Sequence, residues 1–315
     1  RGAFDTAGKL WGLTFTPRTD IPVYHPDVEV FEVKDADGRH VGILYSDYFP
    51  RPSKRGGAWS SAIRMQSVQD GRRVTPVVYN VGNFTKPTAD QPSLITFEEA
   101  LTLFHEFGHA LQDLLSDVTY ESIGGTSVPR DFVELCSQIM ENWAADPEVI
   151  KTYAKHYRTG EPIPLDLLDK IEKTGQFNQG FTTVEFESAC YLDMAWHTLA
   201  EAAPQDAVAF EDALLKKIGM IPEIIVRYRT PYFAHIFSGG YSAGYYSYLW
   251  SEVLDKDAFQ AFKETSLFDP KTAKSFRENI LSKGNTREAM DSYKAFRGRE
   301  PKVEALLKAR GLLKS

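Results

Sequence analysis

Residues 96–115 read TFEEALTLFHEFGHALQDLL, and this stretch decides what kind of domain the chain forms. Its apolar side chains recur at intervals of three and four residues, which is the spacing of the buried face of a helix. They are Leu101, Phe104, Phe107, Leu111, Leu114 and Leu115. The same stretch contains His105, Glu106 and His109 in the order His-Glu-x-x-His. The pattern therefore predicts a helix that carries two histidines and a glutamate.

The spacing of the two histidines suits a single metal ion. Four residues advance a helix by about 400°, so His105 and His109 leave the same face one turn apart. Zinc binds neutral imidazole readily. Glu106 is rotated by about 100° from His105, so its carboxylate can approach a metal-bound water molecule without becoming a ligand. We predict one Zn²⁺ per chain with Glu106 as the general base; the alternative is a charged helix face without metal.

A catalytic zinc ion needs a third protein ligand and an open position for water. A Gly-x-x-His continuation is absent here, because Gln112 and Leu115 stand at those positions. A second helical pattern runs from near Pro129 to Trp143, and Glu134 lies on its polar stripe, 25 positions after His109. That gap leaves room for a glycine-containing loop and for the second helix to pack back across the first. Glu134 is therefore the predicted third ligand.

Two further polar residues follow Glu134 on the same stripe. Gln138 lies one turn further along and Glu141 lies two turns further along. A polar group outside the metal's own ligands often orients a ligating imidazole by bonding its second nitrogen. Either Gln138 or Glu141 could do so here.

The first hundred residues read as strands that form two hairpins. The expected strands are residues 28–33 with 41–45, and residues 63–68 with 74–81. Asp70 and Gly71 separate the second pair, and this dipeptide suits the positive backbone dihedral angles of a hairpin turn. We therefore expect a small antiparallel sheet. The loop Lys54–Gly57 between the hairpins either approaches a ligand or is plain surface.

Helical periodicity dominates the remaining two thirds of the chain. Further helices are expected at residues 147–157, 165–173, 182–203, 207–218, 243–255 and 272–281. No internal repeat and no convincing linker is visible, so we expect one mainly α domain over residues 1–315. Within it, residues 1–95 would form a β-rich subregion and residues 96–315 a helical subregion with the zinc site.

Composition excludes several other classes of function. Lys and Arg number 36 against 43 Asp and Glu, giving a formal charge of −7 and no basic excess for a nucleic-acid partner. Cys136 and Cys190 are the only cysteines, which excludes a disulfide framework and favours a reducing, cytoplasmic location. No run of 18 apolar residues is present, so we expect no membrane partner. The chain begins at Arg1 rather than Met, and its native start is expected to lie further upstream.

The segment from Tyr232 to Trp250 combines hydroxylated aromatic side chains with a pair of glycines. In a structural interpretation, Tyr241, Tyr245 and Tyr248 form a helical stripe packed in the core. In a functional one, the glycines let the segment close over a substrate, while phenol and imidazole groups stabilise an oxyanion formed on a peptide carbonyl. The residues alone leave both interpretations open.

Together these motifs resemble the zinc metallopeptidase family of thimet oligopeptidase, oligopeptidase A and bacterial peptidyl-dipeptidase. The similarity is carried by Phe104–His109, by Arg130–Glu134 followed by Ser137 and Gln138, and by His235–Tyr248. Weaker similarity extends over residues 48–59, 79–84, 178–181 and 297–301. Cys136 departs from the family, which usually carries proline there, and this questions where the second helix begins.

The resemblance implies a zincin-type metallopeptidase domain that hydrolyses short peptides, as an oligopeptidase or a peptidyl-dipeptidase. An edge strand near residues 79–83 would pair with an extended peptide, because main-chain hydrogen bonds tolerate varied side chains. The implied zinc ligands are His105, His109 and Glu134; the implied catalytic residues are Glu106, His235, Tyr241 and Tyr248.

Members of this family are longer, with an N-terminal helical half that forms the opposite wall of a deep channel. This chain would be the C-terminal catalytic half, and the missing half of the same enzyme is a candidate partner. Two alternatives stay open: a zinc-stabilised, non-catalytic fragment that needs that half for activity, and a structural helical domain with an accidental histidine motif. Release of C-terminal dipeptides would need a cation for the substrate carboxylate, and Lys86, Arg227 and Arg229 are candidates or plain surface charges.

Overall fold

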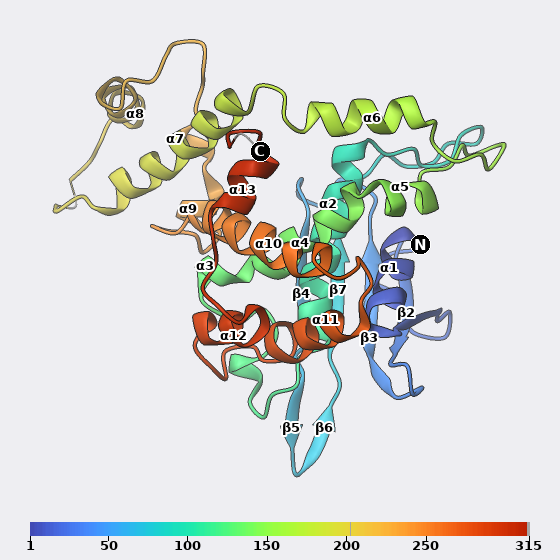
Figure 1. Ribbon diagram of the computed structural model, residues 1–315. Coiled ribbons are helices and arrows are strands. Elements are labelled where there is room, and N and C mark those ends of the chain that lie inside the picture. Colours follow the sequence, from blue (N-terminus) through green and yellow to red (C-terminus); the bar gives the residue numbers. More distant parts are fainter. Residues whose placement is uncertain (202, 314–315) are drawn as a thin grey trace.

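The structure is a computed structural model that describes residues 1–201 and 203–313. Its centre is a long helix, α2 (Phe97–Leu114), packed between a five-stranded sheet and a layer of helices (Figure 1). The expected helix at 182–203 includes residue 202, and the expected domain includes residues 314 and 315. These three positions lie outside the described residues.

The large sheet has the strand order β1-β2-β3-β7-β4. Its strands are β1 (Thr14–Pro17), β2 (Glu29–Lys34), β3 (His40–Asp47), β4 (Trp59–Arg64) and β7 (Val77–Val81). The predicted first hairpin is present as β2 and β3. The sheet is mixed rather than antiparallel throughout, because β3 and β7 run parallel.

The predicted turn at Asp70-Gly71 joins a separate two-stranded ribbon. It consists of β5 (Ser67–Gln69) and β6 (Arg72–Val74), which project from the molecule at the bottom of Figure 1. Asp70 and Gly71 have φ angles of 49° and 72°, the left-handed conformation that such a turn requires. The strand pair expected across this turn is therefore shorter than predicted, and β7 begins only after the ribbon has ended.

Helices make up most of the chain after residue 96, and one more, α1, lies at its start. Besides α2 they are α1 (Gly2–Trp11), α3 (Arg130–Val133), α4 (Leu135–Ala145), α5 (Pro147–Tyr153), α6 (Leu165–Thr174), α7 (Gln179–His197), α8 (Ala207–Lys217), α9 (Ala234–Phe237), α10 (Ser247–Lys263), α11 (Pro270–Phe276), α12 (Ala289–Arg297) and α13 (Glu304–Ala309). Single 3-10 turns lie at η1 (Glu121–Ile123) and η2 (Thr230–Tyr232), and α11 continues into a π-helical turn, η3 (Arg277–Leu281).

Three sequence expectations need correction. The reading of the first hundred residues as strands is wrong for α1, whose buried residues Ala3, Ala7 and Leu10 follow a helical spacing. The helix expected at 129–143 is interrupted at Glu134 and becomes α3 and α4. The helix expected at 243–255 starts only at Ser247, because residues before it form a turn in which Ala243 has a φ of 51°.

Two apolar clusters hold these elements together. The main core joins α1, the sheet, α2, α4, α10, α11 and α12, with Phe107, Trp143 and Tyr293 among its fully buried side chains. The second core is smaller and joins Ala189 and Leu192 of α7 to a group that includes Phe233, Ile236 and Tyr245. Elements from both ends of the chain therefore share the main core. In contrast, α7 packs against the segment around residue 240 in the second core.

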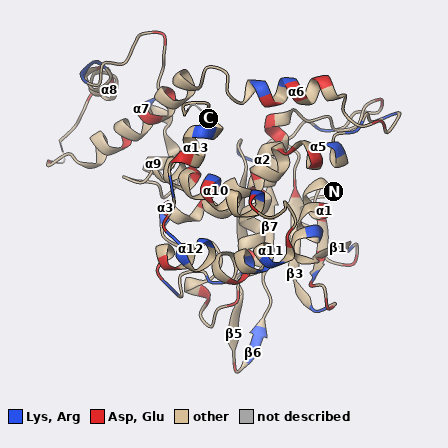
Figure 2. Cartoon of the chain, in the orientation of Figure 1, with Lys and Arg blue, Asp and Glu red and all other residues tan. Residues whose placement is uncertain are grey.

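Charges are mixed over the surface elements. In Figure 2, acidic and basic residues both occur on α6 and on α12. This distribution agrees with the modest net charge of −7. Within the described part of the chain, no helix is both long and apolar enough to cross a membrane.

Asp255 on α10 is a buried carboxyl group with incomplete hydrogen bonding. Its Oδ1 accepts a hydrogen bond of 2.8 Å from Asn142 Nδ2 and lies 3.2 Å from Lys256 Nζ, whereas Oδ2 has no partner among the described residues. Burial raises the pKa of Asp255 to about 7, against the opposing influence of Lys256. The folded protein therefore keeps a proton here that the unfolded chain, with an ordinary pKa of about 3.9, releases.

Stability should consequently fall as pH rises from about 4 to about 7, because the folded state holds the extra proton in that window. Asp255→Asn cannot ionise and should remove this loss. We expect the unfolding free energy of the variant, relative to the parent, to be higher at pH 8 than at pH 5 by at least about 1 kcal/mol. Urea unfolding at both pH values measures it, and an equal difference at the two would contradict the assignment.

Candidate active site

The helix α2 begins with a capping box that fixes where the helix starts. Thr96 Oγ1 accepts a hydrogen bond from the Glu99 backbone N–H at 3.1 Å, and a Glu99 carboxylate oxygen accepts one from the Thr96 N–H at 2.8 Å. Phe104, Phe107 and Leu111 then point into the main core. The neighbouring face carries the two histidines, as the spacing predicts.

Glu134 stands at the junction of α3 and α4. Pro129 precedes α3, and Glu134 is both the C-cap residue of α3 and the N-cap residue of α4. Its side chain is only 2% exposed, and Ser137 Oγ donates a hydrogen bond of 2.9 Å to Glu134 Oε2. From this junction the carboxylate reaches the histidines of α2.

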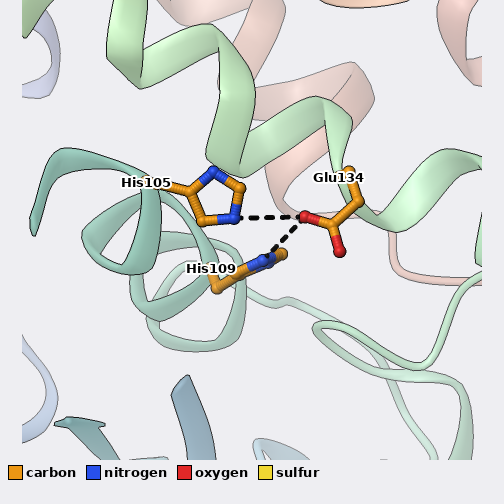
Figure 3. A group of neighbouring side chains, drawn as sticks. All are labelled: His105, His109 and Glu134. Carbon is orange, nitrogen blue, oxygen red and sulfur yellow. Dashed lines mark ion pairs between the residues drawn. The ribbon is translucent and has the colours of Figure 1, made fainter. Parts of the chain in front are cut away.

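The three residues predicted to bind metal meet in space. Figure 3 shows both imidazoles directed at the same carboxylate oxygen: His105 Nε2 lies 3.3 Å and His109 Nε2 3.1 Å from Glu134 Oε2. One donor atom from each residue lies within 4.8 Å of the others. Two imidazole nitrogens and one carboxylate oxygen form a donor set that suits zinc.

Charges in this cluster are strongly coupled. Burial opposes ionisation of Glu134, but the positive charge of His109 and hydrogen bonds from both imidazoles outweigh it and hold the pKa of Glu134 well below its usual range. For His105, burial is outweighed by Glu134 and Glu141, which raise its pKa. The buried, ionised carboxylate of Glu134 is costly in free energy unless a positive charge compensates it. A divalent cation would supply that charge.

Glu141 contacts the imidazole nitrogen of His105 that faces away from the cluster. Its Oε1 lies 2.6 Å from His105 Nδ1, so the second imidazole nitrogen is occupied and Nε2 is left facing the cluster. Gln138, the other residue considered for this role, instead donates a hydrogen bond of 3.1 Å to the backbone oxygen of Tyr248. Of the two alternatives, Glu141 therefore contacts the imidazole of His105, whereas Gln138 links α4 to α10 by a hydrogen bond.

The two metal-site helices cross at Gly108, which lies between the two histidines. A Cβ atom at this position would lie 2.3 Å from the carbonyl oxygen of Cys136 and 2.7 Å from Cα of Ser137. Both obstacles are backbone atoms that cannot rotate away. Only glycine lets α4 approach α2 closely enough to bring Glu134 to the histidines.

Gly108→Ala is therefore expected to push α4 away from α2. We expect a loss of about 2 kcal/mol in unfolding free energy together with weaker zinc binding, measured by urea unfolding and by competition with a chelator. Gly180→Ala is the matched control, because Gly180 is also helical and has no atom within 4 Å of the added Cβ. Equal stability of the two variants would show that the crossing has room to relax.

Glu106 lies beside the cluster without joining it. Its backbone oxygen accepts a hydrogen bond of 2.6 Å from Asn80 Nδ2 of β7, which anchors this turn of α2 to the sheet. The side chain is 8% exposed, and burial raises the pKa of Glu106 above its ordinary value. A carboxylate with a raised pKa beside a metal site has the properties that a general base needs.

The aromatic segment reaches the same place from the other side. Tyr241 donates a hydrogen bond of 2.5 Å from its hydroxyl to Glu134 Oε1, and its ring stacks on that of Tyr248 with centroids 5.1 Å apart. The His235 ring lies 6.1 Å from the Tyr241 ring and 6.3 Å from the Tyr248 ring. Tyr245, by contrast, is 2% exposed and belongs to the second core. The helical stripe of the structural interpretation is therefore wrong, because Tyr241 and Tyr245 precede α10, although Tyr245 is a core residue; the functional interpretation stays a prediction.

A cavity of about 570 Å³ opens over the cluster. Its walls include the three metal-site residues, Glu106, His235, Tyr241, Tyr248, the start of β4 and the loop Arg55–Gly57. Asn83 Nδ2 donates to the backbone oxygens of Arg55 and Gly57, at 3.0 and 2.7 Å, and holds this loop against the sheet. Of the two alternatives for the loop, its position at the cavity favours approach to a ligand.

The edge-strand expectation was placed on the wrong strand. Residues 79–83 begin in β7, which pairs with β3 on one side and β4 on the other and has no free edge. β4 is the strand at the end of the sheet, and its first residues line the cavity. Strand order depends on long-range pairing, which alternation of apolar residues does not encode.

A second cavity, of about 390 Å³, adjoins the first. The two share His105, His235 and Tyr248, but His109 and Glu106 line only the first. Arg227 lines the second cavity and, among the described residues, has no carboxylate within ion-pairing distance. The other two candidate cations lie elsewhere: Lys86 pairs with Asp27, and Arg229 pairs with Glu211.

Sequence reasoning missed Asn80 and Arg130 as contributors to the site, and it missed Asp193, whose carboxylate accepts hydrogen bonds from the aromatic segment. Asn80 is a fully buried amide in the middle of a valine-rich strand, and that unusual placement was a usable signal. Arg130 lies over the Tyr241 ring, 4.5 Å from its centroid, and was considered only as part of a motif. Asp193 lies on a helix far away in sequence, and no local pattern marks it.

Comparison with known proteins agrees with this arrangement. The chain is 45% identical over 313 residues to dipeptidyl carboxypeptidase of Salmonella typhimurium and 40% identical over 316 residues to oligopeptidase A of Escherichia coli. Each alignment covers 99% of this chain and 46% of the relative. A solved structure titled PZ peptidase A with inhibitor 2 has a similar fold, with a TM-score of 0.52 and 16% identity over 84% of this chain and 42% of that one.

The chain thus spans about half the length of the curated relatives it matches. The sequence profile of peptidase family M3 matches it from residue 1 to residue 312. That range includes the metal cluster, Glu106 and the aromatic segment. The chain belongs to peptidase family M3.

Proposed function

We propose that this chain is the catalytic part of a zinc-dependent peptidase that hydrolyses short peptides. The observation that carries the proposal is the single cavity that brings together the His105, His109 and Glu134 cluster, Glu106, and the donors of the aromatic segment. The names of the relatives, dipeptidyl carboxypeptidase and oligopeptidase A, support the same class of reaction.

His105, His109 and Glu134 would hold the zinc ion. When bound, zinc supplies Lewis acidity, which polarises a carbonyl group and acidifies water. Glu106 accepts the proton of the attacking water at its carboxylate and passes it to the amine of the leaving product. Its burial suits this exchange, because a raised pKa lets the carboxyl hold the proton between the two transfers.

His235, Tyr241 and Tyr248 would stabilise the negative charge on the attacked carbonyl oxygen. Burial, aided by the charge of Arg227, lowers the pKa of His235, so the imidazole is neutral at pH 7 and donates an N–H. The phenols of Tyr241 and Tyr248 stay protonated, because burial and the nearby Glu134 raise their pKa values. His235 and Tyr248 would thus offer neutral donors where charge develops, and Tyr241, whose hydroxyl donates to Glu134 Oε1 in this structure, would join them by turning from that carboxylate.

The free edge of β4 would bind the substrate backbone. Its first residues line the cavity, and the strand then leads away from the cluster toward Arg64. An antiparallel peptide on this edge would point its C-terminal end past the cluster and toward the second cavity. Arg227 would bind the C-terminal carboxylate there, since it lacks an ion-pair partner among the described residues.

We also propose that residues 1–315 form one catalytic domain, because the main core combines residues from α1 to α12. Short peptides are its proposed ligands, and an N-terminal half of the same enzyme is its proposed partner, since the chain spans 46% of its relatives. A cytoplasmic location is proposed on the scarcity of cysteine.

Product mapping by mass spectrometry tests the proposal. The zinc-loaded chain is incubated with an unblocked octapeptide and with the same peptide amidated at its C-terminus. Stepwise loss of C-terminal dipeptides from the unblocked peptide only, abolished in Arg227→Gln, is the expected result. Internal cleavage of both peptides would support an oligopeptidase and remove the role of Arg227. Bound zinc without cleavage would favour the non-catalytic fragment that needs a missing half.

A further inference from the structure

Asp193 on α7 makes contacts that no part of the proposed chemistry uses. Its side chain is 1% exposed, and both carboxylate oxygens accept hydrogen bonds from backbone N–H groups of the aromatic segment. Oδ1 accepts from Ala243 at 2.9 Å and Oδ2 accepts from Tyr245 at 2.8 Å. His197, one turn further along α7, places Nδ1 2.8 Å from Oδ1. A single carboxylate thus accepts hydrogen bonds from two amides that lie on either side of Gly244. We call this arrangement of Asp193, Ala243 and Tyr245 the clamp.

The clamped backbone has an unusual conformation. Ala243 has a φ of 51°, which residues other than glycine rarely adopt. Tyr241 and Gly244 form a turn around it, in which the Gly244 N–H donates to the Tyr241 oxygen at 2.9 Å. Such a conformation persists only where the surroundings over-determine it, and here the carboxylate of Asp193 supplies the constraint.

The clamp lies between the second core and the reaction site. Tyr245 is buried against α7 and Phe233 in the second core, whereas Tyr241 and Tyr248, on either side of it, reach the metal-site residues. The metal-site helices belong to the main core instead. Tyr248 lies at the start of α10, which packs in the main core, so Tyr241 is the donor whose distance from the metal cluster also depends on how firmly the aromatic segment is attached to α7.

We infer that Asp193 is a positioning residue that holds residues 241–245 in register over the metal site, so that the Tyr241 hydroxyl stays within reach of the reacting carbonyl. The catalytic part of this inference rests on the proposed function. A carboxylate suits the task because it accepts from two amides at once, with each oxygen aligned on one N–H. Asparagine would keep one acceptor and direct an NH₂ group at the other amide.

Residue-resolved hydrogen exchange tests the clamp without requiring turnover. In the unmodified chain, the amides of Ala243 and Tyr245 should be protected although both lie outside regular secondary structure. In Asp193→Asn, exchange at these two amides should become about tenfold faster or more, while α2 exchanges as before. Unprotected amides in the unmodified chain would overturn the inference, even if the variant failed to fold.

Kinetics test the positioning role. We expect Asp193→Asn to lower kcat by about 10- to 100-fold per zinc-loaded molecule, because small displacements of reacting groups are costly, with KM and zinc content changed less than twofold. Asp206→Asn is the matched control: Asp206 Oδ1 also accepts from two amides, Val208 and Ala209, each at 3.0 Å, but at the start of α8.

The outcomes distinguish failure of the positioning role of Asp193 from failure of the proposed function. Faster exchange with an unchanged kcat, or a lower kcat with unchanged exchange, would overturn the positioning role. An equal kcat loss in Asp193→Asn and Asp206→Asn would do the same, since it would reflect general destabilisation. If the unmodified chain cleaves no peptide, the proposed function fails, and the exchange result alone decides whether Asp193 holds the segment.

Discussion

Glu106→Gln should lower kcat by about three orders of magnitude and leave zinc bound. Glutamine has the same shape but cannot accept a proton, and general-base catalysis commonly contributes about 10²- to 10⁴-fold. The metal-site residues His105, His109 and Glu134 are unchanged in the variant, so the donor set stays complete. Glu106 is 8% exposed, and a neutral amide of equal size keeps the packing there.

Peptide hydrolysis followed by chromatography gives kcat, and elemental analysis of the dialysed protein gives zinc content. Glu98→Gln is a suitable control, because Glu98 lies in the first turn of the same helix and is exposed to solvent. The control should retain the activity of the unmodified chain. A Glu106→Gln variant that kept a tenth or more of kcat would show that another group takes the proton.

The second large effect is expected from His109→Ala, which should lose both zinc and stability. His109 Nε2 lies 3.1 Å from Glu134 Oε2, so its removal takes away one donor and leaves the buried carboxylate with one imidazole. Metal affinity is linked to folding. At a free zinc concentration about 1,000 times Kd, bound metal adds about 4 kcal/mol to the unfolding free energy, and the variant should lose most of it.

Urea unfolding with zinc and with a chelator measures this difference. The chelator should destabilise the unmodified chain and have little effect on His109→Ala. His156→Ala serves as the control, because His156 is exposed in a turn distant in sequence from the cluster. Unchanged zinc content in the His109 variant would remove His109 from the ligand set.

The metal site was predictable from sequence because its signal is local. His105 and His109 share a helix whose apolar spacing is visible without a structure, and the capping box at Thr96 marks its start. Glu134 required one non-local step, from a gap of suitable length and a second helix. The interruption of that helix at Glu134 lies beside the close contact of Gly108 with Cys136, a contact between two backbones that helix propensity does not encode.

The strand order of the sheet, in contrast, was not predictable from local sequence. Hairpin turns such as Asp70-Gly71 are encoded by neighbouring residues, but the position of β7 between β3 and β4 depends on pairing across the chain. Residues 79–83 were therefore expected at a free edge, which belongs instead to β4. Likewise, only the structure distinguishes Arg227, which lacks an ion pair among the described residues, from Arg229, which has one.

The crossing of α2 and α4 also determines which positions can vary among homologous chains. Gly108 meets the carbonyl group of Cys136, and every amino acid has the same carbonyl group, so the contact is indifferent to the side chain at position 136. Cys136 is the second residue of α4, where the N–H has no partner within the helix and proline is equally suitable. Evolutionary drift at position 136 therefore says little about loss of the metal site, whereas any replacement of Gly108 in a homologue would be a warning that the site has degenerated.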